Sequence, residues 1–202
     1  AWYVFIFNSL NCTDWIKWNT AMLSIISFFV IFLLGLKLYI TDEYLWGLQN
    51  AKFIMSLSII MVWILIPFFY FDVKEKILMW DSWTMFLGFM LASLAIISGG
   101  KIATVMVVFW IYSCDAIYVI LKRIKNKKSP LSWDFTHLHH RLLDLWMTKN
   151  QVLVFVWFFS LLFWISSLFF DKTWKIVIFF IIILFVVFID KIILTFKKNA
   201  KK

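Results

Sequence analysis

Long apolar stretches, each close to the length of a membrane span, constrain the fold of this chain most. A helix of about 20 apolar residues crosses the hydrocarbon core of a bilayer. The stretches predict spans near residues 20–40, 51–71, 84–98, 102–121, 151–170 and 174–195. Residues 1–7 are expected to end a preceding span, so we expect the chain to be a fragment of a longer protein.

The composition supports the same fold class. Hydrophobic residues make up 64% and charged residues 15% of the 202 residues, whereas soluble domains are about 45–50% apolar and about 25% charged. The sequence therefore predicts an all-α fold, a polytopic transmembrane helical bundle of about six spans in a single transmembrane domain, 1–202.

Basic residues are concentrated in some of the connecting segments, which predicts the orientation. Segment 122–150 and the tail 196–202 are rich in lysine and arginine, whereas the turns between the other spans carry few. Basic loops stay in the cytoplasm. The net charge of +9 thus largely reflects the orientation of the chain in the membrane. Because no soluble basic domain is predicted, we expect no nucleic-acid binding. The segments predicted to be cytoplasmic are 8–19, 72–83, 122–150 and 196–202.

The three histidines of the chain form one cluster. His137, His139 and His140 lie within four positions, and Arg141 follows. On a helix, His137, His140 and Arg141 would share a face. Such a cationic, hydrogen-bond-donating surface suits phosphates. Zinc is the competing ligand, with Asp134 nearby as a further donor, and the pattern alone leaves both sites open.

Two carboxylates and two amides form a second group of candidates. Asp14 stands just before the first full span and Asp81 opens the third, so each could serve only as a helix cap. The amides of Asn8 and Asn11 donate and accept hydrogen bonds, which suits the edge of a base or sugar. The predicted topology places all four on the same membrane face as the histidines.

Several motifs, in order, resemble those of bacterial polyprenyl-phosphate N-acetylhexosamine-1-phosphate transferases. HLHHRLLDL, which starts at His137, resembles the family's histidine motif. The pattern Asn8-x-x-Asn11-x-x-Asp14 resembles N-x-x-N-x-x-D-G-x-D-G. WDSWTMFLGF, residues 80–89, resembles G-D-x-G-S-x-F-L-G-F. Segments 97–104 and 115–123 also fit, and the motifs together cover nearly all of this chain but only the C-terminal part of a typical member.

The resemblance implies a reaction and its participants. A sugar 1-phosphate moves from a UDP-sugar to undecaprenyl phosphate or another polyprenyl phosphate, and UMP is released, in cell-envelope polysaccharide or teichoic acid synthesis. The HxHHR form resembles the N-acetylglucosamine branch, whereas the peptidoglycan branch usually reads HHHFE. The implied metal is Mg²⁺, with Mn²⁺ as an alternative. The implied setting is the bacterial cytoplasmic (inner) membrane and its lipids, with a cytoplasmic active face, and the resemblance allows a homodimer.

The resemblance also assigns roles to residues. Asp81 matches the metal-binding aspartate and counts as catalytic. The other catalytic positions are His137, His139 and His140, which match groups that hold phosphates. The matching substrate-binding positions are Asn8, Asn11, Asp14 and Arg141.

Two departures from the family pattern concern charged residues. The family's paired aspartates are absent, because the chain has no adjacent Asp-Asp, and Lys17 stands where the second Asp of D-G-x-D-G is expected. The chain alone is therefore expected to be incomplete or inactive. Two alternatives stay open: a noncatalytic fragment or membrane scaffold, and a zinc- or proton-coupled transporter built around the histidines.

A third departure is systematic: tryptophan replaces glycine. The chain has 13 Trp and 5 Gly, although glycine serves where the backbone needs a positive φ or must approach a ligand. We hypothesise that these codons are UGA and are read as glycine in the source lineage; UGG codons would refute this. The positions concerned are Trp15, Trp18, Trp80, Trp83, Trp133 and Trp146.

Overall fold

Every element that the computed structural model describes is a helix. The described residues are 2–11, 13–14, 18–41, 45–98, 110–125, 127, 129, 142–143, 147–169, 177, 180, 181, 184, 187, 188 and 191. The helices are α1 (Trp2–Asn11), α2 (Asn19–Thr41), α3 (Leu45–Val73), α4 (Asp81–Ile97), α6 (Trp110–Lys125) and α8 (Lys149–Phe169). The all-α prediction is therefore confirmed for this part of the chain.

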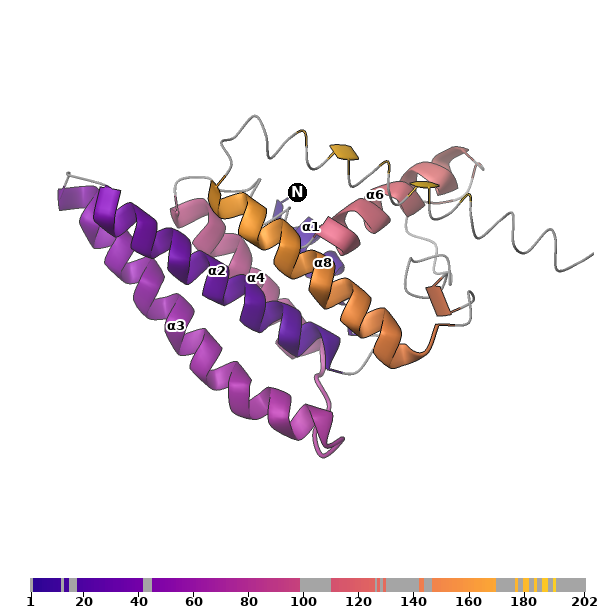
Figure 1. Ribbon diagram of the computed structural model, residues 1–202, viewed down its shortest axis with the longest axis horizontal. Coiled ribbons are helices and arrows are strands. Elements are labelled where there is room, and N and C mark those ends of the chain that lie inside the picture. Colours follow the sequence, from indigo (N-terminus) through magenta and orange to yellow (C-terminus); the bar gives the residue numbers. More distant parts are fainter. Residues whose placement is uncertain are drawn as a thin grey trace, which may run out of the picture.

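Helices α2 and α3 form the longest unit of the fold, an antiparallel pair that lies side by side (Figure 1). Gly35 brings their backbones close together, since a Cβ there would lie 2.8 Å from Met55 Cγ and 3.3 Å from Ile54 Cγ2. Small residues favour such close packing between helices in lipid. Among the described residues, Asn19–Thr41 and Gly47–Val73 are the two stretches long and apolar enough to cross a membrane.

The predicted number of six spans stays a prediction. The stretches at 20–40 and 51–71 correspond to α2 and α3, whereas α4 and the described apolar stretch of α8 are shorter apolar helices. Much of the chain predicted to form spans at 102–121 and 174–195 lies outside the described residues.

Helix α1 packs antiparallel against α4. Trp2 Nε1 donates to the Ala92 carbonyl at 3.2 Å, while Phe7 lies against Gly88, where a Cβ would be 2.8 Å from Phe7 Cδ1. Leu10, fully buried, belongs to the same core as Leu87 and Leu91. Because the two helices run in opposite directions, the end of α1 meets the start of α4.

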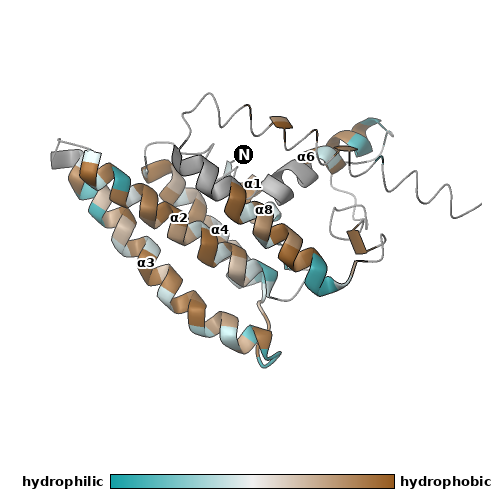
Figure 2. Cartoon of the chain, in the orientation of Figure 1, coloured by the Kyte–Doolittle hydropathy of each residue, from teal (hydrophilic) through white to brown (hydrophobic). Residues whose placement is uncertain are grey.

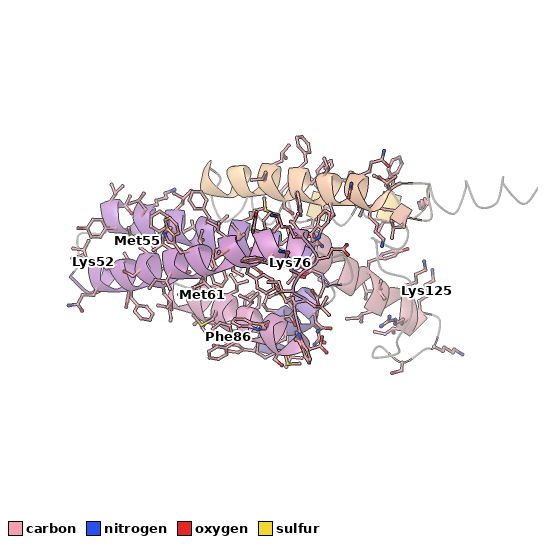
Figure 3. All side chains as sticks on the ribbon, turned by 90° about the horizontal axis from the view of Figure 1, so that it is seen from below. Lys52, Met55, Met61, Lys76, Phe86 and Lys125 are labelled. Atoms are coloured by element: carbon pink, nitrogen blue, oxygen red, sulfur yellow. The ribbon has the colours of Figure 1, made fainter. Side chains whose placement is uncertain are left out.

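The outer surface is apolar along the helices and polar at their ends. Figure 2 shows hydrophobic residues along the middle of α2 and α3, with hydrophilic residues near the ends of α3 and at the start of α8. Trp63 of α3 is 69% exposed, and Phe86 of α4 points away from the bundle (Figure 3). Lys52 and Lys76 lie near opposite ends of α3. This pattern is typical of a helix whose side faces lipid.

Candidate functional site

The end of α1 and the start of α4 bring two of the predicted site residues together. Asn11 Nδ2 donates to Asp81 Oδ1 at 3.1 Å and lies 3.4 Å from Thr84 Oγ1. Thr84 in turn donates to the Asp81 carbonyl at 2.8 Å. Two side chains 70 positions apart in the sequence therefore share a hydrogen bond.

The surroundings of Asp81 argue against a purely capping role. The N-cap position of α4 is Trp80, whose side chain makes no capping hydrogen bond. Asp81 follows as the first helical residue, where the helix dipole favours a negative charge. Its carboxylate is exposed and accepts from Asn11 instead. The carboxylate is thus held from α1 while it remains open to solvent.

Asp14 is the second carboxyl group at this end of the bundle. Its pKa is raised from 3.8 to about 6, chiefly by burial and to a smaller extent by the negative charges of Asp72 and Asp81. A hydrogen bond with Thr20 acts in the opposite direction and lowers the pKa. Asp14 therefore lies close enough to Asp81 for their charges to interact.

Asp72 is a third carboxylate here, and the sequence analysis missed it. Its side chain is only 5% exposed, and it occupies the last turn of α3. The negative end of the helix dipole disfavours an acid in that position. The sequence signal that could have identified Asp72 is an acidic residue directly after the aromatic run Phe68–Phe71. A charged side chain in that position needs a structural or functional reason.

The prediction that Asn8 and Asn11 belong to a loop is wrong. Both lie in α1, which continues to Asn11 because Leu10 is buried in the core shared with α4. Asn8 Nδ2 donates to the Val4 carbonyl of its own helix at 2.7 Å, in an exposed position. The structure thus brings Asn11, but not Asn8, into hydrogen-bonding contact with Asp81.

The remaining predicted site residues lie outside the described part of the chain. Within the described part of the chain, no group of three His, Cys, Asp or Glu side chains is arranged to hold a metal ion. Of the residues singled out in the sequence, those outside the described part are Asp134, His137, His139, His140, Arg141 and Lys17.

One of the six tryptophans occupies a backbone conformation that favours glycine. Trp18 has φ of 72°, a region in which a bulky residue is an outlier. Its indole Nε1–H is buried and has no hydrogen-bond partner among the described residues. Trp80 has φ of −91°, which any residue adopts, and Trp83 is helical. Trp15, Trp133 and Trp146 lie outside the described residues.

Position 18 provides a test of this backbone requirement. We expect the Trp18→Gly variant to be more stable than Trp18→Ala by about 1 kcal/mol, because an L side chain at positive φ is strained. Thermal unfolding of both variants in detergent micelles measures the difference. At Ala21, inside α2, the order should reverse, and Ala21→Gly should be less stable than the parent. Equal stability of the two position-18 variants would contradict the positive φ.

The raised pKa of Asp14 predicts a pH dependence of stability. The folded state holds the proton more tightly than the unfolded state, so Asp14 costs stability as the pH rises from about 4 through about 6. We expect Asp14→Asn to be more stable than the parent at pH 7, by on the order of 1 kcal/mol, with the gain absent at pH 4. Melting curves across this range test it, and a gain independent of pH would contradict the raised pKa.

Comparisons with known proteins agree with the motifs. Residues 1–99 match the model of glycosyl transferase family 4. The chain is 24% identical over 174 residues to the probable undecaprenyl-phosphate N-acetylglucosaminyl 1-phosphate transferase of Bacillus subtilis, covering 83% of this chain and 46% of that protein. No solved structure matches.

Two mycobacterial relatives with related names also match part of this chain. The chain is 30% identical over 118 residues to the decaprenyl-phosphate N-acetylglucosaminephosphotransferase of Mycolicibacterium smegmatis, covering 48% of this chain and 29% of that protein. The protein of the same name from Mycobacterium leprae is 30% identical over 103 residues, which cover 42% of this chain and 26% of that protein. The chain spans less than half the length of these relatives. The resemblance is confirmed over the parts that match.

Proposed function

We propose, from the match of residues 1–99 to glycosyl transferase family 4, that this chain is part of a sugar-1-phosphate transferase. The reaction moves N-acetylglucosamine 1-phosphate from UDP-N-acetylglucosamine to undecaprenyl phosphate and releases UMP. The names of the relatives support the polyprenyl acceptor and the N-acetylglucosamine phosphate group. The structural observation that supports the proposal is the hydrogen bond from Asn11 to Asp81, which assembles two family motifs at one end of the bundle.

Asp81 is suited to hold a divalent cation there. Asn11 donates to Oδ1, which fixes the exposed carboxylate that would hold the metal. Mg²⁺ is typically bound by one or two carboxylates together with water and substrate phosphates, so a cluster of three protein ligands is not required. When bound, Mg²⁺ would neutralise charge on the pyrophosphate of the sugar nucleotide.

The charges around Asp81 support the proposal of a bound cation. Asp14 and Asp72 act on the same region, and three carboxylates repel an anionic pyrophosphate in the absence of a positive charge. Asn11 and Asp14 would contact the nucleotide side of the donor. We further propose that His137, His139, His140 and Arg141 hold the phosphates, because phosphoryl transfer depends chiefly on positioning and charge neutralisation.

Release of UMP tests the proposed function. The full-length protein expected to contain this chain, in native membranes, is incubated with UDP-N-acetylglucosamine, undecaprenyl phosphate and Mg²⁺. UMP should form only when both substrates are present, and addition of EDTA should stop its formation. A membrane scaffold would release no UMP, and that result would overturn the proposal.

A further inference from the structure

A fully buried asparagine, Asn19, joins the end of α1 to α8. It is the first residue of α2, and its side chain is 0% exposed. Asn19 Nδ2 donates to the Thr13 carbonyl at 3.3 Å, and Asn19 Oδ1 accepts from Trp157 Nε1 of α8 at 3.3 Å. A buried amide is costly unless its polar atoms are hydrogen-bonded. Here both ends of the amide bond groups from other segments, so Asn19 links those segments to each other.

The Thr13 carbonyl belongs to a turn that closes the end of α1. The Thr13 backbone N–H donates to the Leu10 carbonyl at 2.8 Å, and the Asp14 N–H donates to the Asn11 carbonyl at 3.2 Å. Thr13 Oγ1 also donates to the Leu10 carbonyl at 2.7 Å. The same oxygen lies 2.6 Å from Thr20 Oγ1 in the first turn of α2. The turn is therefore fixed both to the last turn of α1 and to α2.

Trp157 extends this link to the end of α3. Its ring packs edge-on against Phe69, with ring centroids 6.4 Å apart. Phe69 lies almost one helical turn before the buried acid Asp72 in the last turn of α3. Helix α8 also packs against α2 (Figure 1), and in the sequence it follows the segment that carries the three histidines. Asn19 thus lies where α2 and α8 meet the turn that carries Asp14.

We propose that Asn19 is a positioning residue for the site at Asp81, because its amide holds the turn at Thr13 and Asp14 in place against α8. The proposal rests on the transferase function proposed above. Asn11 donates to Asp81 from the last turn of α1, and the turn held by Asn19 follows directly. A shift of the turn therefore moves the Asn11 amide and Asp14 relative to Asp81. Asn19 acts through these neighbours and not on the substrate itself.

Replacement of Asn19 by leucine, which has nearly the same size, removes both hydrogen bonds and tests the proposal. Asn11 and Asp14 are proposed to contact the nucleotide side of the donor. We therefore expect the KM for UDP-N-acetylglucosamine to rise about tenfold. The Mg²⁺ concentration that gives half the maximal rate should rise too, since the bond from Asn11 to Asp81 is disturbed. Both are measured by UMP release from the full-length protein that contains this chain, as monodisperse protein in detergent.

Trp157→Phe tests the link to α8 separately, because it removes the indole N–H and keeps an aromatic ring beside Phe69. We expect the KM for UDP-N-acetylglucosamine to rise about threefold. In the double variant the KM should stay within about twofold of that of Asn19→Leu alone, because the two changes break the same hydrogen bond. This milder variant also carries the test if Asn19→Leu does not accumulate.

The control is Ile54→Ala, which is matched for loss of stability. Ile54 is fully buried and packs beside Gly35 of α2, in the first half of α3, whereas Asp72 lies in its last turn. The cavity should lower the melting temperature at least as much as Asn19→Leu does. The KM for UDP-N-acetylglucosamine should nevertheless stay within about twofold of the parent.

The outcomes separate this inference from the proposed function. An active parent with an unchanged KM in Asn19→Leu would overturn only the role of Asn19. An equal rise of KM in Ile54→Ala would also overturn it, because loss of stability alone would then explain the effect. An unchanged KM in Trp157→Phe would overturn the link to α8. A parent that releases no UMP would overturn the transferase function and, with it, this inference.

Discussion

Replacement of Asp81 by asparagine is expected to lower kcat by about 10²- to 10³-fold while the fold is retained. The substituted amide keeps the size of the side chain and an oxygen that can accept from Asn11 Nδ2, now 3.1 Å from Asp81 Oδ1. The change removes the negative charge that would hold Mg²⁺. UMP release at saturating UDP-N-acetylglucosamine, measured over a range of Mg²⁺ concentrations, should show the loss together with weaker Mg²⁺ activation.

A nearby carboxylate provides the control for Asp81. Glu75 lies in the exposed turn between α3 and α4, so Glu75→Gln removes one negative charge from the same end of the bundle. We expect its rate to stay within about twofold of the parent. A rate for Asp81→Asn equal to that of Glu75→Gln would contradict the role of Asp81 as a metal-binding residue.

Gly88→Val is expected to lower both activity and stability, because it separates α1 from α4. A Cβ at this position would lie 2.8 Å from Phe7 Cδ1, 3.3 Å from Leu10 Cδ1 and 3.4 Å from Phe7 Cα, and valine adds two methyl groups beyond it. Asn11 follows Phe7 by one helical turn, so movement of α1 displaces its amide from Asp81. Overpacking of this kind costs about 1–3 kcal/mol, and we expect UMP release to fall about tenfold or more.

The two effects of Gly88→Val are measured on one preparation, by thermal unfolding in micelles and by UMP release. Gly35→Ala provides the comparison, since its Cβ would meet Met55 Cγ at 2.8 Å and an unbranched methionine side chain can rotate away. That variant should keep most of its activity. Full activity and an unchanged melting temperature in Gly88→Val would show that α1 does not rely on close contact with α4.

The amino-acid sequence predicted those parts of the fold and site that depend on hydrophobic length and topology. The two long helices follow from uninterrupted apolar stretches, and the proximity of Asn11 to Asp81 follows from two connections on the same side of the bundle. The sequence did not predict that α1 extends through Asn11. That boundary depends on the burial of Leu10 against α4, a tertiary contact that local propensity does not report.

Asp72 was missed for a similar reason. It lies in the segment 72–83, which was predicted to be a cytoplasmic connection, and only the tertiary structure brings its charge near Asp14. Trp18 is the reverse case, because comparison with the family motif predicted a glycine position and the φ of 72° agrees with it. The roles of the histidines and Arg141 stay predictions.

The fate of the β-phosphate of the donor tests the central claim most directly. The protein in membranes is given undecaprenyl phosphate and UDP-N-acetylglucosamine that carries radioactive phosphorus in its β-phosphate only. Transfer of the sugar 1-phosphate predicts that the label enters the lipid fraction and that the released UMP is unlabelled. Label recovered in water-soluble UDP would mean that the sugar alone is transferred, and it would contradict the proposed reaction.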